Sequence, residues 1–417
     1  MTISPDLLCY VILLLQCLIT LTLLVRTPKD SCLRYIFFPS MVYMAYLESA
    51  LISLSDQNTF VKVSTSGMPF TQLLQQANLL LVTGVDLTTQ PGTTRDRLAS
   101  AFTLFQTLRG IGTKWQVKNT PSFPAAAFHH AKPPQRGQFL RGQMAIALWQ
   151  GALLTFLFCI FITHNAWGSD GFYLYDPGRE FRYNFSVEQW LARIRVPFVF
   201  GFPTSMLFLD FQYRMGSVLC VGLGGADVAS WPPLFGSLGD AYTVRGFWGK
   251  FWHQYLRWPF TSVSTAITCR VLRLPKPSLI ERYLNLTIVF LLSGTMHVCA
   301  NIVSGVEGGN PGTLLFFLAQ AGAIIFEDTV QHFWQRRRGI AGTGTPIWQR
   351  IVGFLWVFGW LGTSFAWWWY PIMRALMESD WYGMLRAIQV LGLSMPGIVA
   401  VVVGGGIFLR MVFGAEL

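Results

Sequence analysis

Long apolar runs recur along the whole chain, and short polar segments separate them. A helix of about 20 apolar residues is long enough to cross the hydrocarbon core of a bilayer. We predict nine membrane-spanning helices: Asp6–Val25, Tyr35–Leu54, Phe70–Val85, Met144–Thr163, Pro197–Gly222, Leu284–Val303, Thr313–Ile325, Ile351–Tyr370 and Ala387–Phe413. The pattern therefore predicts an all-α integral membrane protein, a multi-span helical bundle of about nine transmembrane helices. All of residues 1–417 are expected in this single domain.

The segment 245–258 shows a different pattern, because polar and aromatic side chains alternate there with a helical period. Wound as an α-helix, one face carries polar side chains and the opposite face carries aromatic ones. The polar face comprises Lys250, His253, Gln254 and Arg257, and the aromatic face comprises Phe247, Phe251, Tyr255 and Trp258. Such a helix is typical of a membrane surface. We therefore expect an amphipathic interfacial helix over 245–258, within a cytosolic loop 224–283.

Composition agrees with a membrane protein. Of the 417 residues, 52% are hydrophobic and only 12% are charged, whereas an ordinary soluble domain has about 25% charged residues. The net charge of +11 does not indicate nucleic acid, because the cations lie in loops between apolar runs, as the positive-inside rule predicts. Membrane lipid is thus an expected partner, and nucleic acid is not.

The charged loops predict the topology. Loop 94–143 is strongly basic and is expected in the cytosol, whereas loop 164–193 carries acids and the sequon Asn184-Phe-Ser186. We expect that second loop in the lumen, with Asn184 as a glycosylation site. The N-terminus is then lumenal and the C-terminus cytosolic. The seven cysteines are odd in number and form no CxxC pair, so neither a disulfide framework nor a metal site is predicted.

One histidine stands inside an apolar run. His297 lies within the predicted span 284–303, with Ser293 and Asn301 one helical turn on either side. An ionisable residue within a membrane span is a functional hypothesis by default. The alternative is a structural histidine that makes a hydrogen bond between helices, and Ser293 and Asn301 are equally explained as helix-packing residues.

Two motifs carry a resemblance. The run Arg245-Gly-Phe-Trp-Gly-Lys-Phe-Trp-His-Gln254 precedes Ser293-Gly-Thr-Met-His297, and Trp231-Pro-Pro-Leu-Phe235 leads into the first of them. In this order, within a membrane protein, the motifs resemble the wax synthase-like branch of the membrane-bound O-acyltransferases. The run from Arg109 to Asn119 is similar to a segment of fungal secondary-metabolite acetyltransferases in that branch.

The resemblance implies site residues. It implies that His297 is the base that takes a proton from the acceptor hydroxyl, a role that suits histidine because its unperturbed pKa is near neutrality. It implies that His253 orients the reacting groups or lies on the side of the developing oxyanion. The alternative is a histidine that reaches the headgroups at the membrane interface. Trp248, Trp252 and Gln254 are expected to line the same cavity. Arg245, Lys250 and Arg257 are expected to meet coenzyme A phosphates or, equally, anionic lipid.

The expected function is transfer of an acyl group from acyl-CoA to a hydroxyl of a hydrophobic acceptor, in the endoplasmic reticulum. The resemblance favours acetyl-CoA as co-substrate and a terpenoid or meroterpenoid alcohol, without a permanently bound cofactor. A wax ester synthase that uses long-chain acyl-CoA is the alternative within the class. A transporter with His297 as a proton-relay or substrate residue is the alternative outside it. A non-catalytic membrane scaffold is the third alternative.

Overall fold

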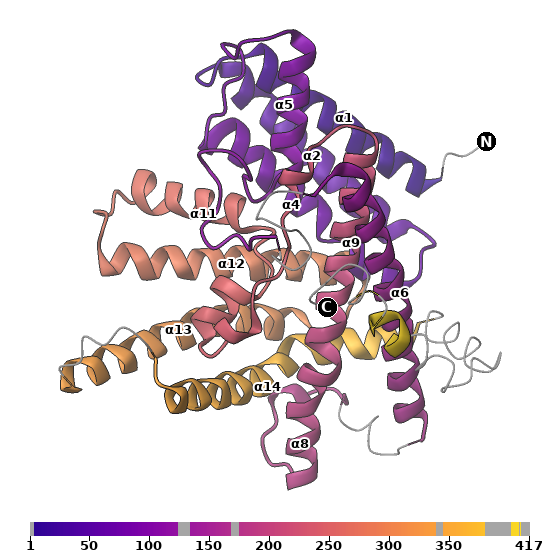
Figure 1. Ribbon diagram of the computed structural model, residues 1–417, viewed down its shortest axis with the longest axis vertical. Coiled ribbons are helices and arrows are strands. Elements are labelled where there is room, and N and C mark those ends of the chain that lie inside the picture. Colours follow the sequence, from indigo (N-terminus) through magenta and orange to yellow (C-terminus); the bar gives the residue numbers. More distant parts are fainter. Residues whose placement is uncertain are drawn as a thin grey trace. The chain divides into compact units, whose positions relative to one another are not determined.

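The computed structural model (Figure 1) describes residues 4–123, 134–167, 175–338, 345–379, 402–407 and 409, without the side chains of 159–167 and 338. These residues form helices joined by turns and loops, with no β-strand among them. They divide into two compact units. Unit 1 comprises Met1–Val117 and Tyr255–Ile340, and unit 2 comprises Lys118–Gln254 and Ala341–Leu417.

Unit 1 contains eight α-helices and two π-helical segments among the described residues. They are α1 (Pro5–Arg26), α2 (Cys32–Leu54), α3 (Thr59–Thr65), α4 (Met68–Ala77), η1 (Asn78–Val82), α5 (Thr94–Gln106), α11 (Arg257–Thr265), η7 (Ala266–Val271), α12 (Leu279–Ser304) and α13 (Asn310–Arg338). In Figure 1, α11, α12 and α13 run side by side, and α12 packs against both of the others.

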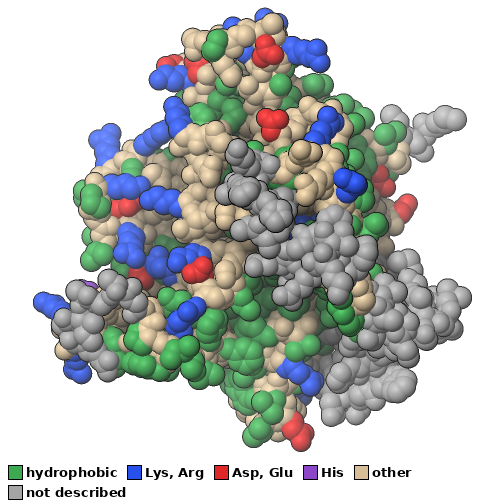
Figure 2. All heavy atoms as spheres, in the orientation of Figure 1, with side chains coloured by type: hydrophobic (Ala, Val, Ile, Leu, Met, Phe, Trp, Pro, Cys, Tyr) green, Lys and Arg blue, Asp and Glu red, His purple; other side chains and the backbone are tan. Residues whose placement is uncertain are grey.

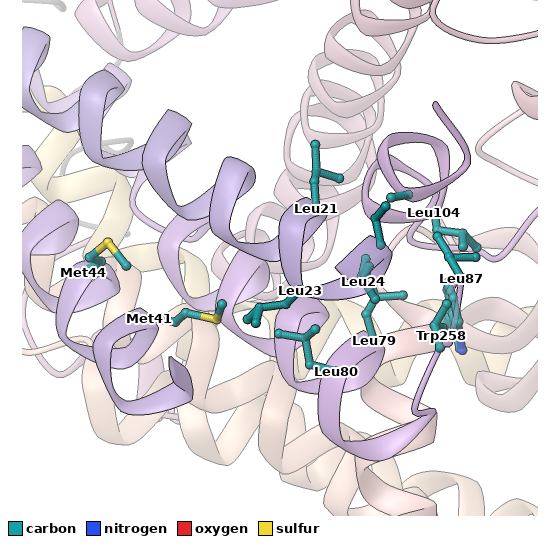
Figure 3. Packing of buried hydrophobic residues seen from close by; sticks show 13 residues of the cluster. Leu21, Leu23, Leu24, Met41, Met44, Leu79, Leu80, Leu87, Leu104 and Trp258 are labelled. Carbon is teal, nitrogen blue, oxygen red and sulfur yellow. The ribbon is translucent and has the colours of Figure 1, made fainter. Parts of the chain in front are cut away.

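The core at the N-terminal end of unit 1 is built from leucine and methionine side chains (Figure 3). Leu24, Met41 and Leu79 come from α1, α2 and η1, and each is 0% exposed. Trp258 of α11 joins the same cluster and is 4% exposed, so the end of the polar-aromatic motif is part of this core. Burying a large apolar side chain stabilises a fold by roughly 1.5–3 kcal/mol.

Unit 2 is built around three long helical stretches. Its described elements include α6 (Arg136–Trp167), η2 (Arg179–Phe181), α8 (Val187–Val196), η3 (Pro197–Gly201), α9 (Phe202–Gly222), η4 (Val228–Ser230), η5 (Leu238–Asp240), α10 (Val244–Gly246), η6 (Phe247–Phe251) and α14 (Ile347–Met377). Figure 1 shows α6 and α9 side by side. Between them, Asp210 accepts a hydrogen bond from Gln150 (2.7 Å) and pairs with Arg214 (2.6 Å).

Six described helical stretches are long and apolar enough to cross a membrane. They are Pro5–Arg26, Cys32–Leu54, Val187–Gly222, Leu279–Ser304, Asn310–Arg337 and Ile347–Met377. Each contains one of the spans predicted from the sequence, so those six are confirmed as membrane-length helices. Helix α6 covers the predicted span Met144–Thr163, but its side chains are described only as far as Phe158. Most of the predicted span Ala387–Phe413 lies outside the described residues.

The predicted span Phe70–Val85 is not among those six stretches. Here α4 contributes ten residues and η1 five, fewer than the roughly 20 that a bilayer requires. Its glutamines are buried within unit 1: Gln75 donates to the Leu104 carbonyl (3.0 Å) and Gln76 to the Gln16 side chain (2.9 Å). A total of nine spanning helices is therefore not confirmed.

The charged loops also contain helices. Loop 94–143 begins with α5, which has a capping box between Thr93 and Asp96, and it includes the first turns of α6. Loop 164–193 ends inside α8, whose N-cap is Ser186 of the sequon, and Asn184 itself is exposed. These loops are thus partly helical: the first leads into α6, and the second leads into the membrane-length stretch Val187–Gly222.

Candidate active site

Helix α12 presents the intramembrane histidine on a regular and well-capped scaffold. Ser278 is the N-cap residue, its hydroxyl accepting from the Glu281 backbone N–H at 3.1 Å. The helix ends at Ser304, and the Gly305 that caps it adopts the left-handed conformation that glycine allows without steric cost. His297 therefore lies well inside a continuous helix, where its position follows from the helical repeat.

A backbone carbonyl fixes the imidazole of His297. Its Nδ1 lies 2.8 Å from the carbonyl oxygen of Ser293, one turn earlier on the same helix. A carbonyl oxygen only accepts hydrogen bonds, so in the neutral ring Nδ1 carries the hydrogen. Nε2 then keeps its lone pair, which is the tautomer that a general base requires.

The opposite wall of this site comes from α13. The rings of His297 and Phe317 are stacked, with centroids 4.4 Å apart and an interplanar angle of 25°. Gly294 eases this approach, because a Cβ there would lie 3.2 Å from Phe317 Cβ and 3.1 Å from Leu314 Cδ1, closer than ordinary van der Waals contact. The glycine of the motif thus lets α13 pack closely against the turn that carries the histidine.

The two predicted neighbours of His297 make different contacts. Ser293 contributes its backbone carbonyl to the imidazole. Asn301 is 3% exposed, and its Nδ2 donates to Thr313 Oγ1 at 3.0 Å, while that hydroxyl donates to the Gly309 carbonyl. This chain of hydrogen bonds joins α12 to the first turn of α13 and so helps to fix Phe317 against the imidazole.

The polar-aromatic segment differs from the predicted helix. The expectation of one amphipathic helix over 245–258 is wrong: the helical part ends at Phe251, and α11 begins only at Arg257. Pro259 is one cause, because in a continuous helix its ring would clash with the Tyr255 carbonyl. With α11 beginning at Arg257, Pro259 falls in the first turn, where no intrahelical N–H is needed.

The second cause is burial of the aromatic side chains. Trp252 is 7% exposed, and its ring contacts Phe202, Phe235 and Phe247 at centroid distances of 5.2, 5.4 and 5.6 Å. A helix on a membrane surface would leave these rings in the interface, whereas the turn brings them into the core of unit 2. Trp248, half-buried, lies beside Trp252 with centroids 6.1 Å apart.

Two glycines allow this turn to pack tightly. The Gly236 N–H donates to the Phe251 carbonyl at 2.9 Å, and a Cβ on Gly236 would collide with the Lys250 carbonyl oxygen. A Cβ on Gly246 would likewise collide with the Asp240 carbonyl oxygen. The segment is therefore held by backbone contacts with residues 236–240 as well as by its aromatic rings.

His253 and Gln254 follow directly after the buried Trp252. His253 is partly buried and packs edge-on against Phe235, with ring centroids 6.0 Å apart. Gln254 is 3% exposed, and its Nε2 donates to the carbonyls of Asn119 (3.0 Å) and Gly249 (3.1 Å). Gln254 therefore acts here as a bridge between two backbone segments.

The run Arg109–Asn119 meets the polar-aromatic motif in both units. In unit 2, Asn119 contacts Gln254 as described, and its Nδ2 donates to the Gly249 carbonyl at 3.3 Å. In unit 1, the Trp115 and Trp258 rings stack with centroids 5.7 Å apart. The backbone N–H of Trp258 also donates to the carbonyl of Leu108, the residue before the run, at 3.3 Å. Both segments carry motifs in the sequence, but their spacing gives no indication that they lie against each other.

The three candidate phosphate-binding cations have different surroundings. Lys250 is exposed and pairs with Asp240 at 3.3 Å. Arg245 and Arg257 are partly buried, and burial lowers the pKa of the Arg257 guanidinium below its usual value. Arginine remains charged in spite of such a shift, because its ordinary pKa lies far above neutrality.

His253 belongs to unit 2 and His297 to unit 1, and the chain passes from one unit to the other between Gln254 and Tyr255. Unit 2 also contains Arg245, Trp248, Lys250, Trp252 and Gln254. Unit 1 contains Arg257, Ser293 and Asn301. Among the described residues, no group of three or more His, Cys, Asp or Glu side chains is arranged to hold a metal ion.

Comparison with known proteins identifies the relatives of this chain. Residues 231–319 match the model of the membrane bound O-acyl transferase family, a range that includes both His253 and His297. The chain is 34% identical to acetyltransferase pyr8 of Aspergillus fumigatus over 95% of its own length and 94% of that protein.

Two further relatives carry the same activity in their names. Acetyltransferase atnC of an Arthrinium species is 35% identical over 96% of this chain and 95% of its own length. Acetyltransferase cdmC of Talaromyces verruculosus is 34% identical over 91% of this chain and 94% of its own length. With relatives this similar along nearly the whole sequence, and with membrane-length helices throughout, the chain belongs to the membrane bound O-acyl transferase family.

Proposed function

We propose that this integral membrane O-acyltransferase moves an acetyl group from acetyl-CoA to a hydroxyl of a hydrophobic acceptor, with His297 as general base. Family membership makes the chain an O-acyltransferase, and its relatives named acetyltransferases favour the acetyl donor. The observation that carries the assignment of the base is the hydrogen bond from His297 Nδ1 to the Ser293 carbonyl, because it leaves Nε2 as the basic nitrogen.

The proposed reaction is direct transfer within a ternary complex. The acceptor hydroxyl oxygen attacks the thioester carbonyl carbon while its proton passes to His297 Nε2. The carbon–sulfur bond then breaks, the ester forms, and the proton returns to the thiolate, so that free coenzyme A leaves. A base of this kind contributes about 10²–10⁴-fold in rate.

The other site residues have supporting roles in this proposal. His253 is assigned to orient the reacting groups or to stabilise the oxyanion that develops on the thioester oxygen. Trp248, Trp252 and Gln254 are assigned to the lining of the acyl-donor cavity, and the burial of Trp252 and the hydrogen bonds of Gln254 support this by giving those two residues fixed positions. Arg245, Lys250 and Arg257 are assigned to the phosphates of coenzyme A.

A terpenoid or meroterpenoid alcohol is the proposed acceptor class, reached from the bilayer, in the biosynthesis of a secondary metabolite. The direct test uses purified protein, radiolabelled acetyl-CoA or palmitoyl-CoA, and a panel of terpenoid and fatty alcohols. Label from acetyl-CoA that enters a lipophilic ester supports the proposal. Transfer from palmitoyl-CoA to fatty alcohols alone would replace it with wax ester synthesis, and turnover of neither donor by folded protein would overturn it.

The proposed location is the endoplasmic reticulum, with the N-terminus in the lumen, the C-terminus in the cytosol, and Asn184 glycosylated. Support comes from the exposure of Asn184 and from the sequon. Because Ser186 also caps α8, the informative pair is Ser186→Thr, which keeps both the cap and the sequon, and Asn184→Gln, which keeps only the cap. Endoglycosidase should increase the gel mobility of wild type and Ser186→Thr, but not that of Asn184→Gln.

A further inference from the structure

Exposed cations gather at one end of unit 1, which we call the basic end. The segment from η7 into α12 and the last turns of α13 contribute to it, and these two helices are joined there by the Arg282–Asp328 ion pair at 2.9 Å. The basic end consists of Arg270, Arg273, Lys276, Arg282, Arg336 and Arg337, all of which are exposed. Figure 2 shows Lys and Arg side chains gathered over the ends of α11, α12 and α13 on the left.

Few of these charges are neutralised within the fold. Glu281 is only 5% exposed, and its carboxylate already accepts hydrogen bonds from Thr268 and Asn285. Lys276 reaches it only at 4.0 Å. Within the described part of the chain, the remaining cations make no ion pair: Arg270, Arg273, Arg336 and Arg337. The basic end thus presents an excess of positive charge to an external partner.

Large aliphatic side chains are exposed among the same cations. Val271 is the last residue of η7 and Leu272 follows it, and 71% and 50% of their surfaces are exposed. Leu279 and Ile280 begin α12, with 67% and 70% exposed. Because α12 is a membrane-length helix, its first residues lie at the level where a helix enters the bilayer.

We propose that the basic end binds anionic phospholipid headgroups at the membrane surface. Cations beside exposed aliphatic side chains match a bilayer interface, where lipid phosphates and carboxylates lie directly above acyl chains. A soluble nucleotide such as coenzyme A would explain the cations but not the four exposed aliphatic residues around them. This interaction is separate from acyl transfer, because the basic end includes none of the residues assigned to the reaction.

The test measures lipid selectivity of the full-length protein. In detergent micelles, the protein is titrated against trace phosphatidylserine or phosphatidylcholine, each with a fluorophore on one acyl chain, and anisotropy reports binding. Wild type should prefer phosphatidylserine, and the preference should fall as salt is added. Arg273→Gln/Lys276→Gln should weaken phosphatidylserine binding by about fivefold for each cation removed, with phosphatidylcholine unchanged.

A matched control uses Arg95→Gln/Lys114→Gln, which removes two exposed cations of unit 1 outside the basic end and should leave the preference unchanged. Val271→Ser/Leu272→Ser should weaken binding of both lipids, because it removes apolar contact. Equal binding of the two lipids by wild type, or an equal loss in the control, would overturn the proposal. Displacement of phosphatidylserine by coenzyme A would overturn it too, by assigning these cations to the acyl donor.

Discussion

The two histidines of the proposed site are held in contrasting ways. His297 lies in a regular helix, and the group that orients it is the carbonyl of the preceding turn, a contact that any such helix offers. His253 lies in a nonhelical turn whose shape depends on buried aromatic rings and on the hydrogen bonds from Gln254 to two backbone carbonyls. One position is thus determined by local backbone geometry and the other by tertiary packing.

This contrast suggests how mutations should behave. Substitution of His297 itself should affect chemistry without loss of fold, since α12 is capped at both ends and long enough to stay helical without this one side chain. Substitution around His253 should affect both together, because the same contacts position the site and stabilise unit 2.

The largest effect is expected from His297→Ala. Loss of the base should lower kcat by about 10²–10⁴-fold, with little change in melting temperature. Radiolabelled acetyl transfer and a thermal melt measure the two quantities. His332→Ala, which alters an exposed histidine of α13, should retain wild-type kcat and serves as the control. A His297→Ala enzyme that turns over like wild type would remove the base role.

A smaller effect on both activity and stability is expected from Gln254→Leu. The change removes two part-buried hydrogen bonds from Gln254 to backbone carbonyls, each worth about 1 kcal/mol, and leaves those carbonyls without that donor. We expect unit 2 to lose about 2–3 kcal/mol of stability and kcat to fall together with it. Gln331→Leu, on an exposed position of α13, is the control and should change neither. A loss of activity with an unchanged melting temperature would instead indicate that Gln254 contacts the substrate directly.

The contact between α12 and α13 is tested by Gly294→Ala. The added methyl would press on Leu314 and Phe317, which should cost about 1–3 kcal/mol and shift the ring beside His297. Gly322→Ala is a matched control within α13, because open space surrounds that position, and it should stabilise the helix by about 0.5–1 kcal/mol. If Gly294→Ala were as stable and active as wild type, close packing at this turn would have no role in the site.

The smallest effect concerns a carboxylate outside the membrane-length helices. Asp86 accepts from the Thr88 hydroxyl (2.6 Å) and from the Thr88 and Lys29 N–H groups, and these hydrogen bonds hold its pKa below the ordinary value. A lowered pKa means that the stabilisation is present at neutral pH and is lost as the pH falls through the value in the folded protein. Asp86→Asn should therefore lower the melting temperature slightly at pH 7, and the difference should shrink below about pH 4.

The hydropathy pattern predicted the fold well wherever a helix is long and apolar. Leu284–Val303 and Ile351–Tyr370 both fall inside observed helices, because about 20 apolar residues leave the backbone no other way to satisfy its hydrogen bonds in lipid. The predicted span Phe70–Val85 is not confirmed as a membrane-length helix, and its buried glutamines bond to neighbouring helices.

The polar-aromatic segment shows what periodicity alone misses. Its helical period is real in the sequence, yet Trp252 is buried by contacts with distant residues such as Phe202 and Phe235. Pro259 is a sequence signal against a helix that runs from the motif into α11, because its ring would clash with the Tyr255 carbonyl. Phe317 carried no signal at all, because nothing in the apolar run 313–325 distinguishes the residue that stacks on His297.

The proposed mechanism depends most directly on the tautomer of one imidazole. Protein labelled with ¹⁵N-histidine and reconstituted in lipid would be examined by solid-state nuclear magnetic resonance, with His297→Gln used to assign the His297 signals by difference. We predict a protonated Nδ1 and an unprotonated Nε2 at pH 7. A spectrum with the proton on Nε2 would contradict the account, because His297 would then have no free nitrogen on the side where a base is needed.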